Sequence, residues 1–336
     1  MVVMMYANIS EEFPCLSRAE FLSLMERKEG FRELLPLTGI ELFELKDAKD
    51  AVEMQMKSST VKSVGVLHML IDAEGHVEIF TCPESFGSIE VRRIQGMGRK
   101  MRREEAKARV ERELRDRCGA VRAKAAPEME LYISEGLLIA GSPLSREGKG
   151  EIMGRNPHSL PFYKPGALNP WYARLLVNLS SPERGGMIYD PFCGTGTIPI
   201  AASELWKEME MICSDIRRDM CAGAKKNLEV LSKLPFEVVR SDASQMPFRE
   251  KLFQSVVSDP PYDRSVRSLY SGARDLLNRT IEQLSRLMKS GGRLVISVDE
   301  EIARGIPIPG DFEQKFKCLM YVHNRLTRAI LVMERK

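Results

Sequence analysis

The chain has 336 residues, a formal net charge of +3, 43% hydrophobic residues and 29% charged residues. This length exceeds what one ordinary core accommodates, so we expect a globular protein of two or three domains. No apolar run approaches the roughly 18 residues of a membrane-spanning helix, and the N-terminus lacks the basic flank and cleavage pattern of a secretory signal. The seven cysteines are an odd number and form no CxxC pair. They disfavour a disulfide framework or a zinc cluster and favour a reduced, cytoplasmic setting.

The N-terminal part predicts mixed α and β structure. Residues 2–10 (VVMMYANIS) are a strand candidate. Ser17 and Glu20 have the spacing of a capping box that opens a helix. Two apolar runs within residues 61–82 predict a hairpin turned at Asp72–Gly75.

A strand and a charged helix are predicted next. Residues 87–94 (GSIEVRRI) favour the strand, and residues 102–119 favour the helix, with Gly119 at its end. The apolar stripe of this helix consists of Ala106, Val110, Leu114 and Cys118. Five glycines and five prolines between Gly141 and Pro170 then predict a linker.

The C-terminal part alternates short apolar runs with helical patterns. The runs GGMIYD, EMICSD, FEVVRSD, FQSVVSD and GRLVISVD predict a parallel sheet with helices on both faces. The last two runs, QKFKCLMYV and RAILVM, are separated by too few residues for a parallel crossover, so they must be antiparallel. The predicted fold class is α/β, a Rossmann-like domain whose mostly parallel sheet ends in an antiparallel hairpin.

Four successive runs of this part end in an acid: Asp190, Asp215, Asp242 and Asp259. Because ligands of open α/β sheets bind beyond the carboxyl ends of the strands, these acids predict one crevice lined with carboxylates. The first acid opens the glycine-bearing turn DPFCGTGT, from Asp190 to Thr197. This turn is neither GxGxxG nor a P-loop, and its acid suits a ligand with a positive group better than phosphates.

The next two acids indicate which ligand the crevice binds. Asp215 has the position of an acid that binds ribose hydroxyls. Asp242 can accept from an exocyclic amine, with Met246 and Phe248 nearby to cover a flat ring. A ribose, an adenine and a cationic amino-acid end together indicate S-adenosylmethionine. The alternative is that these acids only cap helices.

The fourth acid opens DPPY, which comprises Asp259, Pro260, Pro261 and Tyr262. The prolines prevent helical continuation and leave carbonyls free to accept, so this segment suits a planar NH₂ group. Tyr262 can stack on the heterocycle that carries the amine. The alternative is a strand that simply ends in a proline turn. Cys193 fits a small packing residue of the glycine turn better than a nucleophile.

These motifs resemble those of class I S-adenosylmethionine-dependent amino-methyltransferases. Within that class, the segment from His158 to Ser180 looks like the one that precedes the catalytic domain in archaeal THUMP-domain tRNA (guanine-N2) methyltransferases of the guanosine-10 type. The motifs of that family occur here in the same order, at Asp190–Ile198, Cys213–Asp215, Gly223–Leu228, Asp259–Tyr262 and His323–Arg328. The resemblance spans roughly residues 155 to 336 and is looser in the N-terminal half.

The resemblance implies a division of the chain and a role for each motif. An N-terminal ferredoxin-like segment would occupy residues 1–58, a THUMP RNA-binding domain 59–145, a linker 146–170 and the methyltransferase domain 171–336. The cofactor site would include Phe162, Pro165, Asp190, Phe192, Gly194, Thr195, Gly196, Thr197, Asp215, Asp242 and Ala243. The target guanine would be handled by Asp259, Pro260, Pro261 and Tyr262. Asp263 stands where related enzymes commonly have glycine, and its effect stays open.

The implied substrate is a guanosine in tRNA, at position 10, with one or two methyl groups added at N2. Basic residues that could grip tRNA phosphates are Arg92, Arg93, Arg99, Lys100, Arg102 and Arg103, although intervening glutamates leave a solvated surface as the alternative. No metal and no membrane are implied, and a small activator protein stays an open partner. The rival functions are N2-guanine methylation elsewhere in tRNA or rRNA, N6-adenine methylation, and a non-catalytic RNA-binding module.

Overall fold

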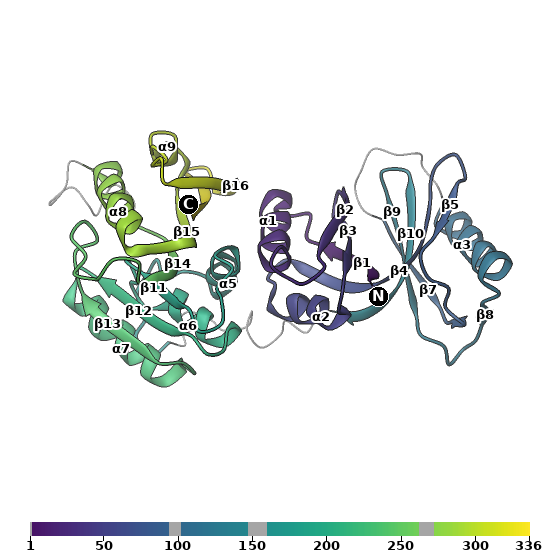
Figure 1. The fold of residues 1–336 in the computed structure, drawn as a ribbon, viewed down its shortest axis with the longest axis horizontal. Helices are drawn as coiled ribbons and strands as arrows, with labels where there is room; N and C mark the ends of the chain where they lie inside the picture. Colours follow the sequence, from purple (N-terminus) through teal and green to yellow (C-terminus); the bar gives the residue numbers. More distant parts are fainter. Residues whose placement is uncertain (1, 94–101, 147–159, 262–271) are drawn as a thin grey trace. The chain divides into compact units, whose positions relative to one another are not determined.

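The computed structural model describes residues 2–93, 102–146, 160–261 and 272–336. The chain divides into two compact units, Met1–Gly148 and Lys149–Lys336 (Figure 1). In the part of the chain that is described, no helix combines the length and apolar character needed to cross a membrane.

One sheet dominates the N-terminal unit. The elements of this unit are, in chain order, β1 (Val3–Ile9), α1 (Pro14–Met25), β2 (Arg32–Leu37), β3 (Ile40–Leu45), α2 (Ala48–Lys57), β4 (Val61–Ile71), β5 (Val77–Ile79), β6 (Ser85–Phe86), β7 (Ile89–Arg93), α3 (Arg103–Cys118), β8 (Val121–Arg122), β9 (Met129–Ser134) and β10 (Leu137–Arg146). Eight strands form the order β2-β3-β1-β4-β10-β9-β7, with β5 paired to β4. Because β1 pairs with both β3 and β4, the segments 1–58 and 59–145 contribute to the same sheet.

The charged helix predicted from its apolar stripe is α3. Ala106, Val110 and Leu114 are fully buried in a cluster with residues of β4, β7 and β9, and Figure 1 shows the helix beside these strands. Gly119 follows the helix with a φ of 65°, and its N–H bonds back to the carbonyl oxygens of Leu114 and Arg115. A left-handed residue at this position favours glycine, which explains where the helix ends.

The predicted capping box at Ser17 and Glu20 is wrong. Helix α1 already begins at Pro14, because proline fits the first turn of a helix without losing a hydrogen bond. Glu20 therefore lies inside the helix, where its buried carboxylate accepts from the backbone N–H groups of Ser59 and Thr60 at 2.7 and 2.9 Å. Glu20 thus fixes α1 to the segment between α2 and β4 instead of capping its own helix.

The sequence also gave no indication of a disulfide. Cys82, which follows β5, is bonded to Cys118 at the end of α3, with the two Cα atoms 5.2 Å apart. The two residues are separated by 36 positions, so their spacing alone could not predict the pair. The sequence disfavoured disulfides, and this expectation is wrong for Cys82 and Cys118.

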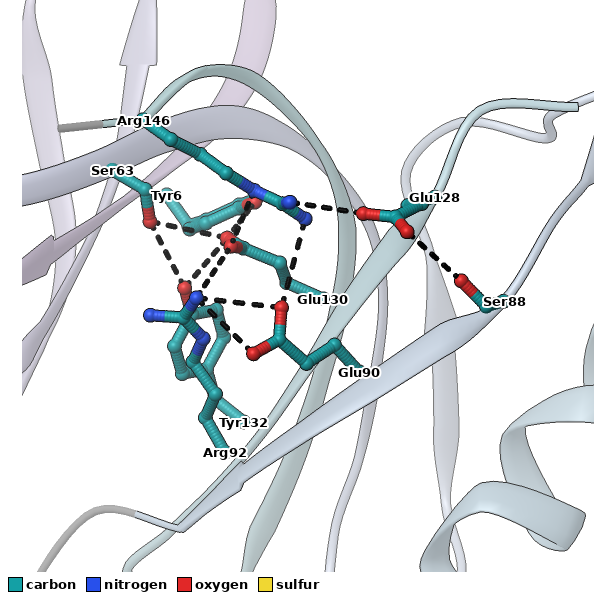
Figure 2. Close-up of polar contacts among 9 residues, drawn as sticks. All are labelled: Tyr6, Ser63, Ser88, Glu90, Arg92, Glu128, Glu130, Tyr132 and Arg146. Atoms are coloured by element: carbon teal, nitrogen blue, oxygen red, sulfur yellow. Dashed lines mark hydrogen bonds and ion pairs between the residues drawn. The ribbon is translucent and has the colours of Figure 1, made fainter. Parts of the chain in front are cut away.

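A buried carboxylate joins several strands of the N-terminal sheet. Glu130 of β9 has no exposed surface, and Figure 2 shows the side chains that surround it. Its Oε2 accepts from the hydroxyl groups of Tyr6 at 2.7 Å, Tyr132 at 2.6 Å and Ser63 at 3.1 Å. Its Oε1 accepts from Nε of Arg146 at 3.1 Å. Since these donors come from β1, β4, β9 and β10, one carboxylate ties together strands from both segments of the unit.

The C-terminal unit has the predicted α/β architecture. Its elements are α5 (Pro170–Leu179), β11 (Met187–Asp190), α6 (Thr197–Leu205), β12 (Glu210–Asp215), α7 (Arg218–Leu231), β13 (Phe236–Arg240), β14 (Phe253–Ser258), α8 (Ala273–Leu287), β15 (Met288–Asp299), α9 (Glu300–Ala303), β16 (Phe312–His323) and β17 (Leu326–Arg335). The sheet order is β13-β12-β11-β14-β15-β17-β16. The first five strands are parallel, and β17 runs antiparallel to both β15 and β16. The predicted antiparallel hairpin is confirmed.

The strand order reverses between β11 and β14, which is where doubly wound sheets bind their ligands. The hydrophobic core around β11 and β14 includes Met246 and Phe248. The ring of Phe248 lies 5.2 Å from that of Tyr189 and 5.3 Å from that of Phe253. Met246 is buried in this core and Phe248 is partly buried against it, and a role for them in covering a bound ring stays a prediction.

Candidate active site

A cavity of about 130 Å³ opens beyond the carboxyl ends of β11 and β14. It brings together many of the residues that the sequence singled out. Those that line it are Pro165, Asp190, Phe192, Gly194, Thr195, Thr197 and Asp259. The structure thus gathers the glycine turn, the DPPY acid and the segment before α5 around one pocket.

Other predicted residues lie beside or away from this pocket. Asp242 does not line it, and its Oδ1 accepts from the backbone N–H and the hydroxyl of Ser244 at 2.8 and 2.9 Å. Ala243 belongs to the buried core. Of the DPPY segment, Pro260 is buried and Pro261 is partly buried. Tyr262, Asp263 and His158 lie outside the described residues.

Asp190 is the most buried acid of the pocket. Its Oδ1 accepts from the hydroxyl of Ser258 at 2.8 Å and from the backbone N–H of Phe192 at 3.0 Å. The pKa of Asp190 is raised to about 7, mainly by burial and less by the nearby Asp215 and Asp259, while the two donors act to lower it. Among the described residues no cationic side chain is paired with Asp190, and a desolvated carboxylate of this kind favours a ligand that brings a cation.

Asp215 shapes the glycine turn from the neighbouring strand. Its Oδ2 accepts from the N–H of Gly194 at 3.1 Å, and its Oδ1 accepts from the N–H of Arg217 at 2.9 Å. Gly194 and Gly196 have φ values of 51° and 85°, which side chains disfavour. Burial raises the pKa of Asp215. Asp215 therefore binds the glycine turn and the residue before α7 at once, but it does not cap this helix, whose N-cap is Arg217.

Asn227 of α7 is a structural residue of the site that the sequence did not identify. Its Nδ2 donates to the carbonyl oxygens of Thr195 and Phe162, and its Oδ1 accepts from the N–H of Phe162, each at 2.8 Å. One fully buried amide therefore joins the glycine turn to the segment before α5. Gly223, one turn earlier, leaves room for the Phe162 ring, which a Cβ atom would approach to 2.0 Å.

Lys164 supplies a cation at the pocket. Its side chain is 42% exposed, and its Nζ lies 3.9 Å from Oδ2 of Asp219 and 5.6 Å from the centre of the Phe162 ring. Together with Asp190, it offers charges of both signs to a ligand. This is the pattern that the ammonium and carboxylate groups of an amino acid require.

Cys193 lines the pocket as a packing residue. A hydrogen bond with the Cys213 thiol and burial raise the pKa of the Cys193 thiol well above its ordinary value. Because the thiolate is the reactive form of cysteine, this environment disfavours a nucleophile. The structure agrees with the packing alternative for Cys193.

Asp259 follows β14 and meets a cation from the last strand. Nη2 of Arg328 lies 3.7 Å from Oδ2 of Asp259. The guanidinium of Arg328 is also stacked over the ring of Tyr172, with 4.6 Å between the guanidinium carbon and the ring centre. The sequence placed Arg328 in a motif but assigned neither Arg328 nor Tyr172 to the site.

The predicted phosphate-binding role of Arg92 is not supported by its environment. Its Nη2 lies 3.3 Å from a carboxylate oxygen of Glu90 and 3.7 Å from one of Glu130, as Figure 2 shows. Arg146 is paired in the same cluster with Glu128. Three acids face two arginines there, so a phosphate would meet a net negative charge.

The other basic residues are described only in part. Arg102 and Arg103 are exposed at the start of α3. Arg99, Lys100 and the side chain of Arg93 lie outside the described residues. A role in phosphate binding stays a prediction for these five.

In the described residues, Asp72, Glu74 and His76 have the composition of metal ligands, with atoms within 4.8 Å of one another. Oδ1 of Asp72 accepts from the N–H groups of Glu74, Gly75 and His76, and its Oδ2 contacts the His76 ring at 2.9 Å. These contacts are those of a tight turn between β4 and β5, and the turn accounts for the closeness of the three side chains. The hairpin was predicted at this position.

Two comparisons define the class of the C-terminal unit. Residues 157–305 match the family model described as "RMKL-like, methyltransferase domain". The whole fold resembles that of TrmN from Thermus thermophilus, with a TM-score of 0.52, 18% identity, and coverage of 99% of this chain and 100% of that one. The matched segment contains the pocket and most of the C-terminal unit, so this unit resembles a methyltransferase domain.

Curated relatives narrow the resemblance further. The chain is 34% identical over 179 residues to "tRNA (guanine(10)-N2)-dimethyltransferase" of Methanothermobacter thermautotrophicus, which covers 53% of this chain and 52% of the relative. It is 34% identical over 199 residues to the protein of the same name from Pyrococcus abyssi, which covers 56% of each. The matches thus span about half the length of these relatives.

Proposed function

We propose that the protein transfers a methyl group from S-adenosylmethionine to the exocyclic N2 amine of a guanosine in tRNA, at position 10. The observation that supports this most is the pocket between β11 and β14, where Asp190 and Asp259 approach the same space. The names of the archaeal relatives favour tRNA, guanine and position 10. This substrate implies a cytoplasmic enzyme.

The residues around the pocket fit the amino-acid end of this cofactor. Asp190 would bind the ammonium group, and Lys164 would bind the carboxylate. The turn at Gly194 and Gly196 allows the backbone to approach the ligand closely. Both carboxylate oxygens of Asp215 already accept from backbone N–H groups, those of Gly194 and Arg217. To bind the ribose, Asp215 would therefore have to accept from the ribose hydroxyls in addition to these groups. Binding of adenine by Asp242 stays a prediction.

Asp259 would handle the target base. When bound, S-adenosylmethionine supplies an electrophilic methyl group on a sulfonium, and the transfer breaks the S–CH₃ bond, forms an N–CH₃ bond and releases one proton to water. Asp259 would accept hydrogen bonds from the amine and thereby direct the lone pair of the amine nitrogen at the methyl group. The carbonyl oxygens near Pro260 and Pro261 add acceptors. Catalysis then consists mainly of positioning and electrostatic stabilisation.

The test uses the purified full chain, an unmodified tRNA transcript and labelled S-adenosylmethionine, with nucleosides identified by mass spectrometry. We expect N2-methylguanosine, and N2,N2-dimethylguanosine if two methyl groups are added. A transcript with inosine at position 10 lacks only the N2 amine, so it should accept no methyl group. Methyladenosine as the sole product would contradict the proposal, and a methylated inosine transcript would contradict the position.

A variant separates catalysis from binding. Asp259→Ala should still bind tRNA and S-adenosylhomocysteine, while turnover falls at least about 100-fold. Normal turnover of this variant would refute the proposed mechanism. Retained RNA binding by a wild-type protein that never transfers a methyl group would instead indicate the non-catalytic RNA-binding module.

A further inference from the structure

Arg328 connects the end of the sheet to the acid of the DPPY segment. In the hairpin register, Arg328 of β17 is opposite Asp299 of β15 and Met320 of β16. Its side chain is 17% exposed and reaches the carboxylate of Asp259, which is 18% exposed, with 3.7 Å between Nη2 and Oδ2. The interaction is thus largely shielded from water. A charge pair in such a shielded position is stronger than one on the protein surface.

The guanidinium is held from a second side. It lies 4.6 Å from the centre of the Tyr172 ring, a favourable distance for a cation over an aromatic face. Tyr172 of α5 is itself buried, and its hydroxyl donates to Oγ of Ser297 in β15 at 2.8 Å. A ring fixed in this way fixes the plane of the guanidinium, and the guanidinium in turn limits the orientations of the Asp259 carboxylate.

The ion pair has a chemical consequence at the target base. An ionised carboxylate only accepts hydrogen bonds, and it offers about four lone-pair sites on two oxygens. Guanine presents two adjacent donors, N1–H and the N2 amine. Adenine presents one donor, the N6 amine, beside the lone pair of N1, which a carboxylate oxygen repels. A charged, oriented carboxylate therefore matches the guanine edge and opposes the adenine edge.

We propose that Arg328 is a positioning residue that holds Asp259 charged and oriented, and that this pair selects guanine over bases that lack N1–H. The inference rests on the proposed function, since it assumes that Asp259 receives the target amine. Arg328 acts through Asp259 and need not touch the base. Its removal should therefore affect turnover and base selection more than the binding of cofactor or tRNA.

The kinetic test compares Arg328→Ala and Arg328→Lys with Arg304→Ala. Arg304, the residue after α9, is a matched control because it is 70% exposed and pairs with Glu300 at the start of this helix. We expect kcat of Arg328→Ala to fall about 100-fold, with KM for cofactor and for tRNA changed less than about threefold. Lysine should restore only part of kcat, because it lacks the planar fork. Free guanidinium ion should increase the turnover of Arg328→Ala but not that of Asp259→Ala.

The selectivity test replaces the target guanosine by 2-aminopurine, which keeps the N2 amine but has no N1–H. The wild-type enzyme should prefer guanosine by at least about tenfold, and Arg328→Ala should lose most of this preference. An unchanged kcat in Arg328→Ala, or an unchanged preference, would overturn the inference. A parallel loss of thermal stability in Arg328→Ala and Arg328→Lys, without guanidinium rescue, would reduce Arg328 to a structural role and overturn it as well.

The two proposals fail in different ways. A wild-type enzyme that forms no N2-methylguanosine refutes the proposed function before any variant is compared. A wild-type enzyme that forms it, with Arg328→Ala equally active and equally selective, refutes only the role of Arg328.

Discussion

Each unit of the chain contains a buried carboxylate, but the two have opposite surroundings. Glu130 of the N-terminal unit accepts from three hydroxyl groups and one guanidinium. Asp190 of the C-terminal unit accepts from one hydroxyl and one N–H and lines a cavity. Breaking a buried charge away from its donors destabilises a fold, whereas a buried charge beside a cavity favours a ligand. We expect the number of donors, rather than burial, to distinguish a structural acid such as Glu130 from the acid proposed to bind the cofactor.

The largest effect should follow from neutralising Asp190. Asp190→Asn keeps the shape of the side chain but removes the charge that would bind the cofactor's ammonium group. We expect the dissociation constant for S-adenosylhomocysteine, measured by titration calorimetry, to rise about 100-fold. The melting temperature should not fall, because the variant also removes a desolvated charge. Unchanged affinity would show that Asp190 is as structural as Glu130.

The complementary change is Glu130→Gln. It leaves the two arginines of the cluster without their buried partner, so the free energy of unfolding should fall by about 3 kcal/mol. Urea unfolding followed by circular dichroism measures this loss. The affinity for S-adenosylhomocysteine should stay within about twofold of the wild-type value. Glu128→Gln is the control, because Glu128 is 58% exposed and should cost less than about 1 kcal/mol.

A change behind the pocket should have a smaller effect. Gly223→Ala would place a Cβ atom 2.0 Å from the Phe162 ring and displace the segment that Asn227 joins to the glycine turn. We expect KM for S-adenosylmethionine to rise about tenfold with little change in KM for tRNA. Gly310→Ala is the matched control, since its Cβ would meet no atom within 4 Å. Equal kinetics for the two variants would exclude a role for this contact.

The last prediction, similar in size to the effect of Gly223→Ala, is a pH dependence of cofactor binding. The pKa of Asp190 is raised to about 7, so its carboxyl is ionised above this pH and protonated below it. A cationic ligand group needs the ionised form, so affinity should fall as the pH falls. We expect the dissociation constant of S-adenosylhomocysteine to be about tenfold higher at pH 6 than at pH 8. Asp190→Asn should show a flat profile, and tighter binding at pH 6 would contradict the assignment.

The sequence predicted which strand-end acids would lie together in the candidate site, because local sequence patterns determine where these strands end. Asp190 and Asp259 end strands of a parallel sheet, and such ends meet at one edge. Asn227 and Arg328 escaped prediction because their partners, Phe162 and Asp259, are far away in the chain. An amide or a guanidinium has no pattern of its own that reveals which carbonyl or carboxylate it will reach.

One error shows the limit of a local motif. Glu20 fits a capping motif, yet its carboxylate binds the segment before β4. A contact made by folding replaced the contact that the nearby sequence suggested. The parallel strands and the final antiparallel hairpin, by contrast, follow from the alternation of strands and helices and from a short connection, and both were predicted.

The position of β17 has a consequence for synthesis. This strand lies between β15 and β16 in the sheet, although it follows both in the chain. A nascent polypeptide that has reached β16 already contains the glycine turn and the DPPY acid, but its sheet has a vacant position and Asp259 lacks Arg328. The ribosome must therefore synthesise β17 before Asp259 receives its cation, so a chain interrupted after β16 would carry every strand-end acid and still lack the Arg328–Asp259 pair.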